Sequence, residues 1–135
     1  MDGLIALRSL LVADAALTAL VPASRIQADV MPLDTALPAI ALQSISIVDQ
    51  NIPSPGPTRF VRERVQVTVM AANYSSQREV LEAVRHAAAD QINFDAAGIT
   101  NVTVHTENMG PDGIANGTNI RTRSQDFMVR YTETR

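Results

Sequence analysis

The clearest hydrophobic pattern in the chain is a strict alternation over residues 60–72, where valines share one face and polar or charged side chains fill the other. A period of two residues predicts a β-strand with one buried face. Residues 39–50 alternate as well, but their apolar parity changes partway, which predicts a β-bulge. Residues 101–108 and 120–133 predict two more strands, and residues 25–30 a short edge strand.

Two regions instead show helical periodicity. Leucines recur at helical spacing near the N-terminus, and Asp14 is placed to cap a second short turn, so we expect either one helix or a broken one. A second helix is predicted from Ser75 or Ser76 to Ile92, with Glu79 at the position that a capping box requires.

The order of these elements is helix, three strands, helix, two strands, with no repeat and no linker. It predicts one domain over residues 1–135 of the α+β class: a mostly antiparallel sheet with two helices packed on one face. Two strand connections are long. The first, Asp49–Phe60, is rich in proline, and the second, residues 109–119, is rich in glycine, so we expect two extended hairpin tips.

Composition narrows the possible functions. The chain has 46% hydrophobic and 19% charged residues, which is typical of a folded domain, and its formal charge of −3 does not favour tight binding to duplex DNA. It has no cysteine, which excludes disulfides and thiolate chemistry. Charged residues interrupt the apolar N-terminus, so we expect neither a signal peptide nor a membrane span.

Candidate catalytic chemistry is sparse. The two histidines, His86 and His105, lie on different predicted elements, and no phosphate-binding, nucleophile or metal-binding motif is present. We therefore expect no catalytic residues, no metal and no cofactor.

Charged side chains on the predicted strands are the candidate interaction residues; Arg121 and Arg123 continue the parity of the apolar residues Phe127, Val129 and Tyr131 toward the loop. Every basic residue is arginine, whose planar fork suits fixed pairing with carboxylates. These residues lie either on solvated surfaces with weak ion pairs or in a subunit interface. The candidates are Arg62, Arg64, Arg121, Arg123, Asp126 and Arg130.

The proline-rich connection is the candidate docking loop. Proline restricts the backbone, so less conformational entropy is lost when a partner holds the loop. The alternative is a tolerated surface insertion, because loops accept extra length at low cost. The residues proposed for docking are Ile52, Pro53, Pro55, Pro57 and Arg59.

The order of several short motifs resembles a known family. A leucine-rich helix is followed by an Asp-x-x-Leu-x-x-Leu-Val stretch from Asp14 to Val21 and by Arg-Ile-x-x-x-Val-x-Pro from Arg25 to Pro32. A valine strand then leads through Ala72 and Tyr74 into a helix. Together with LPAIALQSIS and the closing SQDFMVRYTE, this order resembles the tail terminator or tail-completion proteins of long-tailed siphophages and gene transfer agents.

The resemblance implies a structural virion protein, assembled in the host cytoplasm, and no enzyme. It implies a ring, commonly a homohexamer, at the head-proximal end of the tail tube, which ends tube polymerisation and provides the head–tail joining surface. The partners would be further copies of the chain, the tail tube protein and head–tail connector proteins, and DNA would pass through without being read. The alternatives are a head-completion or connector adaptor, or a small enzyme or ligand-binding module.

Overall fold

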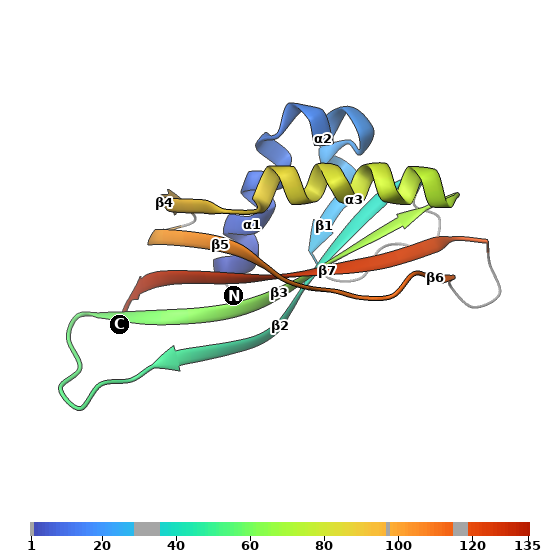
Figure 1. Ribbon diagram of the computed structural model, residues 1–135. Helices are drawn as coiled ribbons and strands as arrows, with labels where there is room; N and C mark the ends of the chain where they lie inside the picture. The colour runs from blue at the N-terminus through green and yellow to red at the C-terminus, as the bar shows by residue number, and fades with distance from the viewer. Residues whose placement is uncertain (1, 29–35, 97, 115–118) are drawn as a thin grey trace.

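The computed structural model describes residues 2–28, 36–96, 98–114 and 119–135. Within them the chain forms one twisted sheet with its helices gathered on one side (Figure 1). The predicted α+β class is confirmed. The described residues form three α-helices, because the N-terminal helical region is divided into two.

The sheet has the strand order β1-β2-β3-β7-β5-β4, with β6 beside the start of β7. Its ladders are antiparallel except for the short parallel pair β1–β2. The long central strands β3 and β7 pair along their whole length. The strands are β1 Ile26–Ala28, β2 Ala39–Gln50, β3 Thr58–Ala71, β4 Gln91–Ala96, β5 Ile99–Met109, β6 Gly113–Ile114 and β7 Arg121–Thr134.

The bulge predicted in β2 is confirmed. Ser44 pairs with Val65, whereas Ser46, two residues on, pairs with Arg64, only one residue back along β3. The extra residue reverses which face each later side chain of β2 occupies. The outer half of β2 is therefore patterned differently from its buried inner half.

The N-terminal helical region is broken, one of the two forms that its pattern allowed. Helix α1 spans Asp2–Ala13 and α2 spans Ala15–Leu20. Between them Asp14 has an extended backbone, and its side chain accepts a hydrogen bond from the backbone N–H of Ala16 at 3.3 Å. This is the capping role expected of an aspartate at a helix start.

Helix α3 spans Tyr74–Ala88, and both of its predicted ends are corrected. Its N-cap is Asn73, whose side chain accepts from Ser76 N at 2.8 Å, so neither serine caps the helix. The chain leaves the helix through extended Ala89 and through Asp90, whose φ of 61° lies in the left-handed region. Strand β4 then begins where the pattern predicted a last helical turn.

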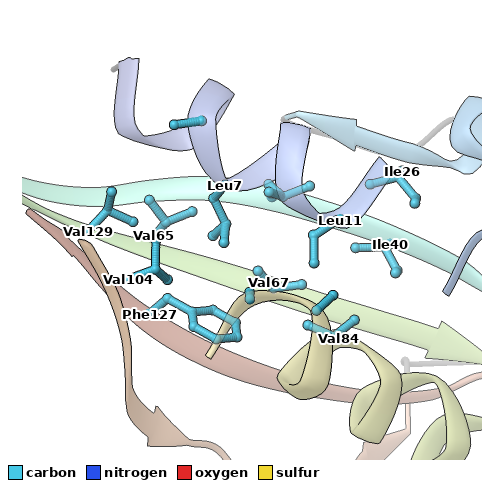
Figure 2. Packing of buried hydrophobic residues seen from close by; sticks show 14 of the residues in the cluster. Leu7, Leu11, Ile26, Ile40, Val65, Val67, Val84, Val104, Phe127 and Val129 are labelled. Atoms are coloured by element: carbon cyan, nitrogen blue, oxygen red, sulfur yellow. The ribbon is translucent and has the colours of Figure 1, made fainter. Parts of the chain in front are cut away.

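The core lies between the sheet and the helices and is almost entirely aliphatic. Leu7 and Leu11 from α1 and Val84 from α3 point toward side chains of β3, β5 and β7 (Figure 2). Phe127, which is fully buried, is the largest apolar side chain there, and truncating such a residue typically costs about 3–5 kcal/mol. Apolar burial on this face explains why the helices gather on it.

The two long connections lie at opposite ends of the sheet (Figure 1). Register shows this directly, because Thr58 at the start of β3 pairs with Thr134, while Ala71 at its end pairs with Arg121. The β2–β3 loop therefore precedes one end of this ladder, and the β5–β7 connection leads into the other. Residues 115–118 of the second connection lie outside the described residues.

Candidate assembly surfaces

Four of the predicted interface residues share the face of the sheet that carries no helix. Arg62 and Arg64 alternate with the buried residues of β3, and Asp126 and Arg130 alternate with those of β7. Arg64 donates to Asp126 Oδ2 from Nε at 3.0 Å and also from Nη2. Asp126 is only 5% exposed, so this contact is a firm cross-strand pair.

Arg62 and Arg130 are two positive charges on this face that no described acidic residue neutralises. They are direct partners across β3 and β7. No described residue forms an ion pair with either one, and like charges placed opposite each other destabilise a sheet. The two guanidinium groups therefore give this surface a local positive charge that a carboxylate-bearing partner would neutralise.

The other two predicted arginines lie on the helix-bearing face, near the opposite end of the sheet. Arg123 has the same parity as the core residue Phe127, donates from Nε to the carbonyl of Gly110 at 2.8 Å and lies 3.4 Å from Asp112. Arg121 pairs with Ile114 of β6. These contacts brace the β5–β7 connection, so the six predicted residues form two separate surfaces.

The outer part of the β2–β3 hairpin projects beyond the helices; this segment, residues 45–60, is called the arm below (Figure 1). From residue 45 to residue 50 β2 is exposed on both faces. Five large apolar side chains on the arm are between 39% and 56% exposed. Exposed apolar side chains gathered on one segment, here on both faces of its strands, are typical of an interaction site. The residues are Ile45, Ile47, Val48, Ile52 and Phe60.

The proline-rich tip is the end of the arm. Strand β2 ends at Gln50 and β3 begins at Thr58, so the loop is residues 51–57, shorter than the predicted Asp49–Phe60, and every residue in it is exposed. At its base Arg59 pairs with Asp49 at 3.1 Å, and the carbonyl of Pro57 accepts from Arg135 N at 2.9 Å. These two contacts hold the base of the loop in place, and the prolines at 53, 55 and 57 are exposed beyond it.

Sequence reasoning missed a buried carboxylate, Glu63, which lies beneath the start of α1. Its oxygens accept from Gly3 N and Leu4 N, both at 3.2 Å, and from the hydroxyl of Tyr131 at 2.9 Å. A negative charge at a helix N-terminus is stabilised by the helix dipole. Burial, and next the neighbouring Glu63 carboxylate, raise the pKa of Tyr131 well above its usual range.

Glycine at position 3 permits this close approach, since an added Cβ would lie 2.9 Å from Glu63 Oε1. The signal for Glu63 was present in the sequence, because the residue has the same parity as the buried valines of β3. Its function is to fasten α1 to the sheet.

A small hollow beside α3 is the other notable feature. It encloses about 220 Å³, below the usual size of a small-molecule site, and is lined in part by Tyr74, Gln77, Arg85 and Arg123. Among the described residues no three acidic or histidine side chains gather in a way that could hold a metal ion. No helix in the described ranges is long and apolar enough to cross a membrane.

The fold and its surfaces define a class of protein: a small α+β domain whose prominent features are an apolar arm and charged strand faces, as in assembly proteins. The family described as tail completion protein gp17 matches residues 5–129. The chain belongs to this family. It is therefore a structural protein of the virion tail and not an enzyme.

Comparison with solved structures supports the fold. A chain from the virion of a native gene transfer agent particle superposes with a TM-score of 0.73 at 18% sequence identity. The match covers 93% of this chain and 91% of that one. No curated protein sequence matches.

Proposed function

We propose that the protein forms a ring, a homohexamer as the family resemblance implies, at the head-proximal end of the tail tube. There it ends tube polymerisation and provides the surface to which the head joins. Membership of the tail-completion family is the observation that carries the proposal. In this arrangement the chain contacts copies of itself, the tail tube protein and the head–tail connector proteins.

The two-ended shape of the domain supports such a position. β3 and β7 are 14 residues each, so their shared ladder is about 45 Å long. The arm lies at one end and the β5–β7 connection at the other. A subunit of this shape presents separate surfaces to two neighbours along the tail axis, one on the head side and one on the tube side.

The surfaces also suit closure into a ring. A cyclic assembly with head-to-tail contacts requires two different complementary patches on each subunit. The apolar arm is one candidate patch, and the positive Arg62–Arg130 pair is a second one, which a carboxylate-bearing surface would complement. The formal charge of −3 is consistent with DNA passing through a channel without being held tightly.

Imaging of particles that lack this protein tests the proposal. We expect tails of uncontrolled length, or finished tails that do not join heads, and we expect both defects to be reversed when the wild-type chain is supplied. Normal infectious particles in its absence would contradict the proposal. Binding of the purified chain to isolated portal complexes, with none to tail tubes, would instead identify it as a connector adaptor.

A further inference from the structure

Within the described ranges the sheet has two edges that no strand covers. On one side β1 pairs only with residues 40–42, so no described residue pairs with the outer edge of β2 from Gln43 to Gln50. On the other side β4 is the last strand in the order, and its outer edge has no pairing partner among the described residues. Open edges present unpaired N–H and C=O groups that pair readily with another strand.

The two open edges lie at the same height along the strands. One row of paired residues crosses the sheet from β2 to β5 through Val48, Arg62, Arg130 and Thr103. The next residue of β5, Val104, pairs with Gln91 of β4. The open part of β2 and the start of β4 are therefore opposite ends of the same band of sheet, as the left side of Figure 1 shows.

Past its bulge, the edge of β2 has little of the usual protection. Natural edges are blunted by charged side chains, proline, bulges or short length. Residues 46–50 pair regularly with β3, contain no proline and include exposed Ile47 and Val48; their one charged side chain, Asp49, pairs with Arg59. The β4 edge contains two register shifts and Asn93 at a φ of 52°, so a partner strand can pair regularly with only part of it.

Direction and length of the two edges also agree. Successive antiparallel steps through β3, β7 and β5 leave β4 running in the same direction as β2. Copies related by rotation about an axis along the strands would therefore join β2 to β4 in parallel, the sense in which β1 already pairs with β2. β4 has six residues, and eight positions of β2 are open.

From these observations we infer that the open edge of β2 receives β4 of a second copy of this chain, so that one sheet continues from subunit to subunit. The inference rests on the proposed ring and specifies its interface. Pairing of two different edges is heterologous and can close into a ring, whereas β2 pairing with β2 would stop at a twofold dimer. Hydrogen bonds between the two backbones supply the affinity, and contacts between the apolar side chains of the two strands supply the specificity.

Engineered cysteines test the edge pairing directly, since the chain has none of its own. Ile92→Cys on β4 is combined in turn with Ser46→Cys, Val48→Cys and Gln50→Cys, which share the helix-free face of β2. By strand alternation after Gln91, residue 92 lies on that face too. Four strand spacings, about 19 Å, separate the edges within one chain, too far for an internal disulfide.

After mild oxidation of assembled rings or tails, we expect at least one of the three pairs to give a covalent ladder that extends beyond dimers. Single-cysteine variants stop at dimers. Val48→Cys with Ile114→Cys is the matched control, because Ile114 is 53% exposed but pairs with Arg121 at the far end of the sheet. We expect at least tenfold less ladder from that control.

Rings seen by electron microscopy that give no ladder from any of the three pairs would overturn the edge pairing and leave the ring in place. A chain that stays monomeric both alone and on tail tubes would overturn the ring itself. As a second test, Val48→Lys should abolish ring formation while the melting temperature of the monomer is kept. Unimpaired rings from Val48→Lys would count against the inference.

Discussion

Replacing Glu63 with glutamine should destabilise the domain strongly, although the two side chains have nearly the same shape. Glu63 is fully buried and accepts hydrogen bonds from the backbone of Gly3 and Leu4 and from the Tyr131 hydroxyl. In Glu63→Gln one acceptor oxygen becomes an NH₂ group. That group would face N–H or O–H donors in place of a negative charge.

The magnitude follows from these contacts. A hydrogen bond to a charged group contributes about 1.5–3 kcal/mol, and a buried donor left without an acceptor costs about 1–3 kcal/mol. At least one of the three bonds is lost, and the interaction with the N-terminus of α1 is weakened. We therefore expect Glu63→Gln to lower the free energy of unfolding by about 2–4 kcal/mol, and Tyr131→Phe, which removes one bond, by about 1.5–3 kcal/mol.

Urea unfolding followed by circular dichroism measures both changes, and a double-mutant cycle isolates their coupling. Because the two residues share a bond, the double variant should lose at least about 0.5 kcal/mol less than the sum of the single variants. Glu133→Gln is the matched control, since this carboxylate is partly exposed and pairs with Arg59 at 3.5 Å. We expect it to cost at most about 1 kcal/mol. A Glu63→Gln variant no less stable than Glu133→Gln would refute the reasoning.

Four further predictions concern the helix anchor and the assembly surfaces. Gly3→Ala should destabilise by about 1–3 kcal/mol in urea, because its Cβ would lie 2.9 Å from the buried carboxylate and from the tyrosine ring; a gain in stability would contradict this. The folded-state pKa of Tyr131 is raised, so its contribution to stability is present below about pH 10 and is lost as the pH rises further. Between about pH 9 and 11 the melting temperature of Tyr131→Phe should therefore fall less than that of the wild-type chain. Parallel plots of melting temperature against pH for the two proteins would contradict this. Arg62→Glu should reduce binding to tail tubes at least tenfold in a sedimentation assay and leave the melting temperature within about 2 °C. The control Arg78→Glu, on α3, should not reduce this binding, and equal binding by both variants would exclude a role for the positive pair. Replacing residues 51–57 by Asn-Gly should leave folding intact but impair head joining in an in vitro complementation assay, and full joining would identify the tip as a tolerated insertion.

The long strands, the bulge in β2 and the class of the fold could be predicted from alternation alone, because one face of each strand is buried. The end of α3 could not. Gln91 and Ile92 continue the apolar stripe of the helix, and neither glycine nor proline marks the stop. The helix ends because Ala89 has an extended backbone, and Asp90 then adopts a left-handed one, which aspartate tolerates but its sequence context does not announce.

Strand parity also contained information about the candidate residues. Arg123 has the parity of Phe127, and Glu63 has that of the neighbouring valines, so both belong to the helix-bearing face, whereas Arg62 belongs to the other. Grouping the arginines by residue type alone joined two surfaces that the sheet separates. The exposure of the apolar side chains on the arm depends on where the helices and β1 end. The residue pattern of a single strand does not specify where its neighbours end.

The position of the protein on the tail is the central claim, and labelled tails test it most directly. Headless tails assembled with a tagged copy of this chain are decorated with gold and imaged by electron microscopy. The account predicts one ring-sized cluster of label per tail, at the end opposite the adsorption tip, on tubes of uniform length. Label distributed along the tube, or found only on heads, would contradict it.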